Sequence, residues 1–211
     1  MIRIRLTEND EIEMTDEEFN DFFNEYDLEA DDLILPFEEV KDCIKGITLL
    51  SADEAENLLT EEQRKCKYNN EPCWWWLRSP GGGGGWVRDE FLSDGYSPEE
   101  IDQMFAAYVN LVGSVRYVGY NVCNDIGCVR PALILSNLKS SNLKSIEELG
   151  VGEHFEFGGY TFTVISNKYA LCDEAIDEMA FREDYEAKDA NVYEKSDVKK
   201  FLDNWFRENY K

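Results

Sequence analysis

The chain has 211 residues, of which 43% are hydrophobic and 13% aromatic, a composition that supports a buried core and argues against global disorder. Its formal net charge is −24, from 45 acidic and 21 basic residues. This charge disfavours direct binding to nucleic-acid phosphates or to an anionic membrane. It fits a basic protein partner, a cation or a solubility role better.

The N-terminus and the cysteines indicate the compartment. Residues Met1 to Leu6 alternate apolar and basic side chains and lack the continuous apolar stretch of a secretory signal, and no stretch is long enough to span a bilayer. Six cysteines are scattered through the chain without a dense framework, so we expect reduced thiols and a cytoplasmic location. The cysteines are Cys43, Cys66, Cys73, Cys123, Cys128 and Cys172.

The N-terminal third predicts short strands and acidic helices. The first 70 residues hold 21 acidic against 7 basic residues, so the charge is concentrated there. Four aromatic residues recur at helical spacing after Thr15, which predicts a helix that turns them toward the core. They are Phe19, Phe22, Phe23 and Tyr26. The other expected elements are a strand at 3–6, a helix at 37–44, a strand at 47–50 and a helix at 52–59 that Ser51 caps.

Three consecutive tryptophans open the central stretch, which runs from Cys73 to Leu135. Residues 74–76 must divide between the two faces of a strand, so we expect at least one face to be a core wall. The five glycines at 81–85 lack the Lys-Ser/Thr of a phosphate-binding loop, and therefore predict a loop or a site of close backbone approach. Further elements are expected as a meander: strands at 86–88, 108–110, 115–118 and 129–135, a helix from 97 toward 108, and turns at 113–114 and 124–127.

The sequence after the central stretch contains a literal duplication. Ser-Asn-Leu-Lys-Ser occurs at 136–140 and again at 141–145. Two copies of five residues are too few for a solenoid and predict a lengthened linker. After it we expect a helical turn at 146–149, a β-hairpin of strands 153–157 and 160–165, and an amphipathic helix at 196–209.

Few residues offer catalytic or metal-binding chemistry. His154 is the single histidine, and no neighbour in the sequence pairs with it as a nucleophile, so we expect a surface or structural role. The spacings of Cys66 to Cys73 and of Cys123 to Cys128 do not match a structural zinc site, which leaves a disulfide or a metal open without favouring either. We therefore expect no cofactor, no metal and no enzymatic activity.

Arg78 and Arg130 stand near the two ends of the central stretch. A guanidinium offers five donors, which suit backbone carbonyls where loops cross. We expect both arginines to hold loops in place rather than to capture a ligand.

Two motifs in the central stretch resemble a known family. They are Trp-Trp-Leu-Arg-Ser-Pro-Gly at 75–81 and Gly-x-Val-Arg-Pro-Ala-Leu at 127–133, with Cys128 inserted before the valine. The chain resembles the bacterial and phage-associated domain family DUF6273. This resemblance implies an α+β, C-type-lectin-like fold shared with formylglycine-generating-enzyme-type domains and with the variable proteins of diversity-generating retroelements. The cysteine pair of formylglycine-type catalysis has no match here, so the resemblance implies a binding scaffold.

The order of the family's pieces differs in this chain. A strand like 158–165 and a helix like 193–203 precede the tryptophan motif in the family, but follow the second motif here. This order implies a circular permutation, in which 1–135 is the C-terminal-type part, 136–152 the linker and 153–211 the part that completes the same domain. The alternatives are a chain cut from a tandem array and a homodimer that exchanges its halves.

The insert between the two motifs is the expected binding surface. It is rich in aromatic residues, glycine and asparagine, a composition typical of adaptable surfaces, and we expect it to bind a protein partner. The candidate residues are Trp86, Arg88, Phe91, Tyr96, Tyr108, Tyr117, Tyr120 and Asn121. An alternative is an acidic decoy of phage or mobile-element origin that blocks a basic nucleic-acid-binding groove of a host defence protein. A third reading is an enzyme or metal protein built on Cys123, Cys128 and His154.

Overall fold

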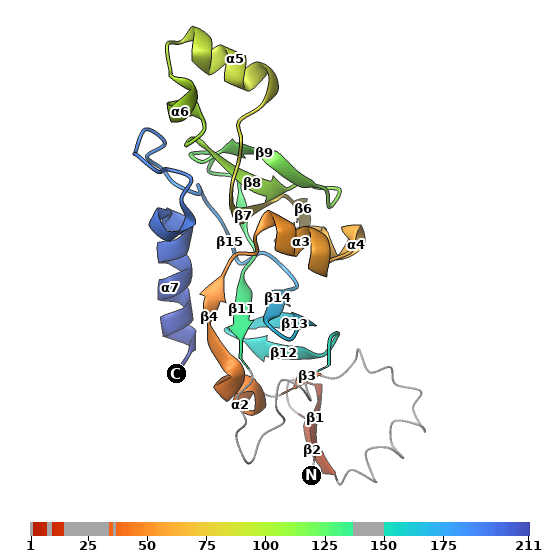
Figure 1. Cartoon of the computed structure of the whole chain (residues 1–211). Coiled ribbons are helices and arrows are strands. Elements are labelled where there is room, and N and C mark those ends of the chain that lie inside the picture. The colour runs from red at the N-terminus through yellow and green to blue at the C-terminus, as the bar shows by residue number, and fades with distance from the viewer. Residues whose placement is uncertain (1, 8–9, 15–33, 36, 137–149) are drawn as a thin grey trace.

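Open β-sheets with short helices beside them make up the part of the chain that the structure describes. The computed structural model describes residues 2–7, 10–14, 34–35, 37–136 and 150–211. The main sheets have six and five strands. Figure 1 shows the C-terminal helix beside the first of them. The expected mixture of helices and strands in one chain is confirmed. The duplicated linker and the helices expected after Thr15 and at 146–149 lie outside the described residues.

The six-stranded sheet joins segments from both sides of the duplicated linker. Its order is β3 (Ile34–Leu35), β12 (His154–Phe157), β13 (Tyr160–Ser166), β14 (Tyr169–Cys172), β11 (Ala132–Leu135) and β4 (Ile44–Thr48). The expected hairpin is confirmed, because β12 and β13 pair around Gly158 and Gly159, whose φ angles are 61° and 82°. The sequence did not indicate β14, because all four of its residues are buried and no alternation marks it.

The five-stranded sheet contains the tryptophan motif. Its order is β15 (Asp177–Glu178), β10 (Cys128–Val129), β7 (Trp75–Pro80), β8 (Phe105–Val109) and β9 (Val115–Asn121). Strands β7, β8 and β9 form an antiparallel meander, in which β8 and β9 correspond to the strands expected at 108–110 and 115–118. The single strand expected at 129–135 is divided: β10 runs parallel to β7, and β11 lies in the six-stranded sheet. Two hairpins complete the strands: β1 (Ile2–Thr7) with β2 (Asp10–Met14), and β5 (Cys66–Tyr68) with β6 (Glu71–Cys73).

The helices are short except for the last. They are α2 (Phe37–Val40), η2 (Lys41–Cys43), α3 (Ala52–Leu58), α4 (Glu61–Arg64), α5 (Gly85–Ser93), α6 (Pro98–Ile101), η3 (Tyr193–Lys195) and α7 (Asp197–Asn209). Ser51 caps α3 as expected: its hydroxyl accepts from the Glu54 N–H, and the Glu54 carboxylate accepts from the Ser51 N–H. The expected C-terminal amphipathic helix is also confirmed. Within the described ranges, no helix combines the length and the apolar character needed to cross a membrane.

Two expectations for the insert were wrong. Residues 86–88 lie in helix α5 rather than in a strand, and the nearby carbonyls of β9 already accept hydrogen bonds from Gly82 and Gly83. The helix that begins at Pro98 ends at Ile101 instead of running toward Tyr108, because the following residues pair with both β7 and β9. The segment before the tryptophans, for which the sequence predicted no element, contains α4 and the β5–β6 hairpin.

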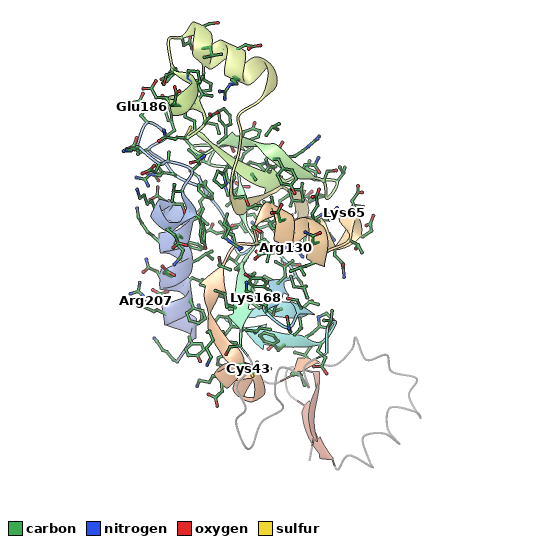
Figure 2. The ribbon with its side chains drawn as sticks, in the orientation of Figure 1. Cys43, Lys65, Arg130, Lys168, Glu186 and Arg207 are labelled. Atoms are coloured by element: carbon green, nitrogen blue, oxygen red, sulfur yellow. The ribbon has the colours of Figure 1, made fainter. Side chains whose placement is uncertain are left out.

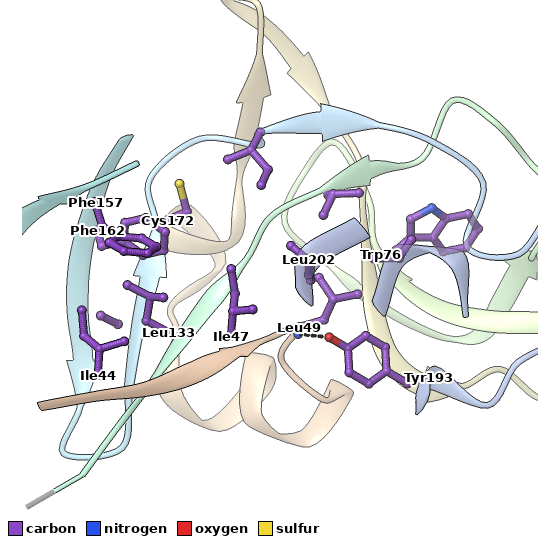
Figure 3. Packing of buried hydrophobic residues seen from close by; sticks show 14 of the residues in the cluster. Ile44, Ile47, Leu49, Trp76, Leu133, Phe157, Phe162, Cys172, Tyr193 and Leu202 are labelled. Carbon is purple, nitrogen blue, oxygen red and sulfur yellow. Dashed lines mark hydrogen bonds between the residues drawn. The ribbon is translucent and has the colours of Figure 1, made fainter. Parts of the chain in front are cut away.

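Strand β7 separates two hydrophobic clusters. Trp76 packs in one cluster with residues of the six-stranded sheet and of α7, whereas Trp75 and Leu77 pack in the other with residues of α3. All three side chains are fully buried, so the expected division of the tryptophans between two faces is confirmed. Figure 3 shows the first cluster, where the Leu49 N–H donates to the Tyr193 hydroxyl at 3.2 Å.

The glycine run is a site of close backbone approach. The N–H groups of Gly82 and Gly83 donate to the carbonyls of Tyr117 and Val118 at 3.1 and 2.9 Å, where β9 bulges away from β8. A Cβ on Gly81 would lie 2.7 Å from the Cα of Gly119, which is itself held at a φ of 78°. Only glycine fits at Gly81 and Gly119, so the glycine run serves the packing of the backbone rather than a ligand.

The two arginines have the structural roles expected of them. Arg78 donates to the Leu49 carbonyl at 2.8 Å and forms a two-pronged ion pair with Glu54, which ties α3 to β7. Burial opposes the charge on Glu54, but hydrogen bonds from Arg78, the Ser51 N–H and Tyr169 outweigh it and lower the pKa of Glu54 to about 2. Arg130 donates to the carbonyls of Cys172 and Gln63 at 2.8 and 2.9 Å, at the centre of the molecule (Figure 2).

Candidate functional site

Three aromatic side chains form one open surface on the five-stranded sheet, which we call the aromatic face: Trp74, Tyr108 and Tyr120. The ring centroids are 5.3 Å apart for Trp74 and Tyr108, 5.2 Å for Trp74 and Tyr120, and 5.7 Å for Tyr108 and Tyr120. The buried Trp76 ring supports them from below, 4.7 Å from Trp74 and edge-on. Each of these distances lies in the range of favourable aromatic contacts, so the surface is pre-formed.

The aromatic face is accessible although its rings contact each other. Tyr120 is 43% exposed, and Trp74 and Tyr108 are half-buried. Its neighbour is the exposed turn that holds Asp125 and Ile126. This turn lies close because a Cβ on Gly127 would be 2.8 Å from the Trp74 ring. The expected site residue Asn121 shapes the start of the turn, since its side-chain oxygen accepts from the Cys123 N–H at 3.1 Å.

Three other expected site residues belong to a separate cluster around α5 and α6, which we call the satellite cluster. The Phe91 ring packs against Tyr96 and Phe105, with centroids 5.3 and 6.1 Å away. Arg88 forms an ion pair with Asp102 and donates to the Gly82 carbonyl at 3.3 Å. Arg88, Phe91 and Tyr96 therefore hold α5 and α6 to the sheet. Trp86 lies in α5, but its side chain is outside the described part.

Tyr117 lies on the same strand as Tyr120 but reaches a different neighbour. Its hydroxyl contacts Glu56 at 2.7 Å and Asp53 at 3.3 Å, both on α3. The hydrogen bond to Glu56 is the main cause that raises the pKa of Tyr117 to about 12. Tyr117 is thus engaged with the scaffold. Of the expected residues whose side chains the structure describes, Tyr108 and Tyr120 lie on the aromatic face.

Trp74 was missing from the expected site. Residues 74–76 were expected to lie in one strand with at least one face against the core, but Trp74 precedes the first residue of β7 and remains half-buried. The available signal was the alternation of side chains along a strand, which places Trp74 and Trp76 on the same side. Its position just before the first residue of β7, at the end of that alternation, leaves it accessible.

The polar residues of the third reading do not come together in one place. His154 Nδ1 and the Thr163 hydroxyl are 2.8 Å apart in the six-stranded sheet, and that hydroxyl donates to Asp173. Cys128 is instead buried in the five-stranded sheet, so the structure does not support a single site of Cys123, Cys128 and His154. Among the described residues, no group of three His, Cys, Asp or Glu side chains has a geometry that could hold a metal ion.

Three of the cavities in the described part of the chain lie away from the aromatic face. A cavity of about 440 Å³ lies between β4 and α7, one of about 300 Å³ between α3 and the β13–β14 turn, and one of about 230 Å³ beside Arg130. None of them is lined by Trp74, Tyr108 or Tyr120. With Tyr120 43% exposed, the aromatic face is an open surface, which suits a macromolecular partner better than an enclosed small molecule.

Comparison with protein-family models, with curated proteins and with solved structures finds no match to this chain. Its function is therefore argued from the geometry and the charge of the site.

Proposed function

We propose that this chain is a non-enzymatic recognition domain that binds a basic segment of a protein partner through the aromatic face. The observation that carries the proposal is the contact of three aromatic rings on an open sheet surface, with Tyr120 43% exposed. Tyrosine and tryptophan provide rigid contact area with little loss of conformational entropy, and they dominate binding energy at protein interfaces.

The charge of the chain favours a partner that carries arginine or lysine. Its net charge is −24, and the exposed Asp125 lies in the turn beside Trp74. The exposed Arg116 is in register with Tyr108 and is a basic group at the same face, so the attraction comes from the rings and from the charge of the whole chain. A guanidinium or ammonium group over an electron-rich ring is attracted by the ring and by this net charge together.

We also propose that the fold is a circularly permuted C-type-lectin-like domain, which would present this surface between its two core motifs. The first motif forms β7, and the second forms β10 and β11 on either side of Arg130 and Pro131. Support for the permutation comes from the six-stranded sheet, in which β12 to β14 from the C-terminal segment lie between β3 and β11. The C-terminal segment thus completes a sheet that the N-terminal segment begins.

The test is a binding titration with three peptides of equal length, one rich in arginine, one neutral and one rich in glutamate. We expect the arginine-rich peptide to bind preferentially and to change the tryptophan fluorescence. Tyr120→Ala should weaken its affinity by roughly 10- to 30-fold, the effect of losing a central aromatic contact. The matched control is Tyr117→Ala, on the same strand and similarly exposed, which should leave the affinity unchanged. Equal affinities of all three peptides, or an equal loss in both variants, would overturn the proposal.

The second candidate is the acidic decoy, which the exposed carboxylates of α3 and α4 favour. Asp53, Glu56, Glu61 and Glu62 are all exposed on these two neighbouring helices. A decoy would bind a basic groove mainly through charge, so its affinity would fall steeply with salt and would not depend on Tyr120. The same titration, repeated over a range of salt concentrations, therefore separates the two functions.

A further inference from the structure

Three cysteines meet beside the tryptophan strand, two from one hairpin and the third from a strand that is distant in the sequence. Cys66 and Cys73 are direct cross-strand partners in the β5–β6 hairpin, and the turn between the strands is fixed by Asn69 and Asn70, whose φ angles are 51° and 68°. Pro72 has no N–H, so Lys67 and Pro72 are a non-hydrogen-bonded pair. The two kinds of pair alternate along antiparallel strands, so Cys66 and Cys73 are a hydrogen-bonded pair, in which the Cα atoms lie farther apart. The Cα atoms of such a pair lie about 5.5 Å apart, inside the range of a disulfide bond.

Cys128 is the third member of the group. Its N–H donates to the Trp74 carbonyl at 3.0 Å, which places it next to the chain at Cys73. The Cys73 thiol interacts with the thiols of both Cys66 and Cys128, and all three side chains belong to one hydrophobic cluster. All three are free thiols. The structure thus provides one cross-strand thiol pair and a third thiol within reach of it.

Accessibility differs among the three thiols. Cys66 and Cys128 are buried, whereas Cys73 is half-buried and is the one that an external reagent can reach. The described residues bring no imidazole to these thiols, since His154 lies in the other sheet. Their geometry allows thiol–disulfide exchange that enters at Cys73. The Cys128 thiol and burial raise the pKa of Cys73 to about 12, so the exchange is slow at neutral pH and speeds up as the pH rises.

We propose that Cys66, Cys73 and Cys128 form a disulfide modification site, in which Cys73 exchanges with a small-molecule disulfide and Cys66 resolves the adduct. Cys73 loses its proton and attacks one sulfur of the small disulfide, which forms a mixed disulfide and releases one thiolate. Cys66 then loses its proton and attacks the Cys73 sulfur, which forms the Cys66–Cys73 bond and releases the second thiolate. Two protein thiols are oxidised by two electrons in total, and one disulfide is reduced to two thiols.

This site is independent of the proposed partner binding, but it adjoins the aromatic face. Cys73 immediately precedes Trp74, so a covalent cross-link at Cys73 restrains the backbone that positions that ring. Cys128, hydrogen-bonded through its N–H to the Trp74 carbonyl, is the alternative resolving thiol. Oxidation therefore has a direct optical readout in the fluorescence of the neighbouring tryptophans.

The test is incubation of the full chain with excess oxidised glutathione at mildly alkaline pH, followed by peptide mapping without reduction. We expect a peptide pair linked through Cys66 and Cys73, and a melting temperature raised by a few degrees, since the bond closes a short loop. In Cys66→Ser, we expect Cys73 to retain the glutathione adduct or to link to Cys128. The matched control is Cys123→Ser, which removes another half-buried thiol and should leave the Cys66–Cys73 linkage unchanged.

Two results would overturn the proposal. One is oxidation confined to Cys123, with Cys66, Cys73 and Cys128 recovered as free thiols. The other is a stable glutathione adduct on Cys73 in the unmodified chain, since a neighbouring resolving thiol must remove it. Neither result bears on peptide binding by the reduced protein, so this proposal and the proposed function fail separately.

Discussion

The aromatic face and the satellite cluster have similar composition but opposite environments. The sequence places their residues within one insert, yet Tyr108 and Tyr120 contact Trp74 on an open sheet surface, whereas Phe91 and Tyr96 pack inward against the sheet. The two environments differ because short helices and paired strands differ in whether they must bury their aromatic side chains. Helices α5 and α6 are too short to be stable alone and need their aromatic residues for docking, while a paired strand can leave an aromatic side chain facing outward.

The segment that follows β14, which contains Met179, covers part of the five-stranded sheet and so determines where the aromatic face begins. The Met179 carbonyl accepts from the Trp76 indole N–H at 3.0 Å, so this segment reaches Trp76 and buries it completely. Tyr120, on the edge strand β9, remains 43% exposed. The same side of the sheet therefore passes from core at Trp76 to surface at Tyr120, and function is expected only at the exposed end.

The largest effect is expected where the glycine run joins the two regions. Gly119→Ala would place a Cβ 2.8 Å from the Ala106 carbonyl oxygen and from the Cα of Gly81, at a φ of 78° that disfavours any side chain. Strain and overpacking together should lower the free energy of unfolding by about 3 kcal/mol. Chemical denaturation measures this loss.

Gly82→Ala is the matched control for that substitution. A Cβ on Gly82 would meet no atom within 4 Å. We expect its free energy of unfolding to stay within about 0.5 kcal/mol of the unmodified chain. Equal destabilisation by the two substitutions would show that the backbone crossing does not hold the two regions together.

Acid should loosen the tie between α3 and the strand under the aromatic face. The pKa of Glu54 is about 2 in the folded chain and 4.5 ordinarily, so its contribution is fully present above pH 4.5 and is lost as the pH falls toward 2. We expect this contribution to be about 2 to 3 kcal/mol. Denaturation at several pH values measures it as the difference between the unmodified chain and Glu54→Gln. That difference should be largest at neutral pH and should close near pH 2, and a difference that does not vary with pH would contradict the assignment.

Opposite responses are expected when one ring is removed from each region. Phe91→Ala removes a half-buried ring from the satellite cluster and should lower the free energy of unfolding by about 1 to 2 kcal/mol, less than a fully buried phenylalanine. It should leave the affinity for the arginine-rich peptide unchanged. Tyr120→Ala should weaken the affinity for the arginine-rich peptide and leave the free energy of unfolding nearly unchanged. The comparison fails if both variants lose stability and affinity together.

Much of the scaffold could be predicted from local patterns. The cap at Ser51, the Gly158-Gly159 hairpin and the C-terminal amphipathic helix depend on neighbouring residues, and all three were confirmed. The roles of Arg78 and of the glycine run also followed from their chemistry, because few environments suit a buried guanidinium or a row of glycines.

The site could be predicted only in part, because it depends on contacts between distant residues. Composition marked the insert as aromatic but could not show which rings face the sheet and which face solvent. Trp74 joins Tyr108 and Tyr120 only through the pairing of β7, β8 and β9. The approach of Cys128 to Cys73 likewise depends on the parallel pairing of β10 with β7, which no spacing along the chain reveals.

The smallest effect is expected from Tyr117→Phe, which tests the comparison within a single strand. Tyr117 and Tyr120 are 46% and 43% exposed, but only Tyr117 bonds to the carboxylates of α3. These bonds lie at the surface, where water replaces them, so loss of the hydroxyl should change the free energy of unfolding by less than about 0.5 kcal/mol. Peptide affinity should not change, because Tyr117 lies off the aromatic face. A measurable loss of affinity would extend the binding surface toward α3, where Asp53 and Glu56 would then contribute the charge that attracts the partner.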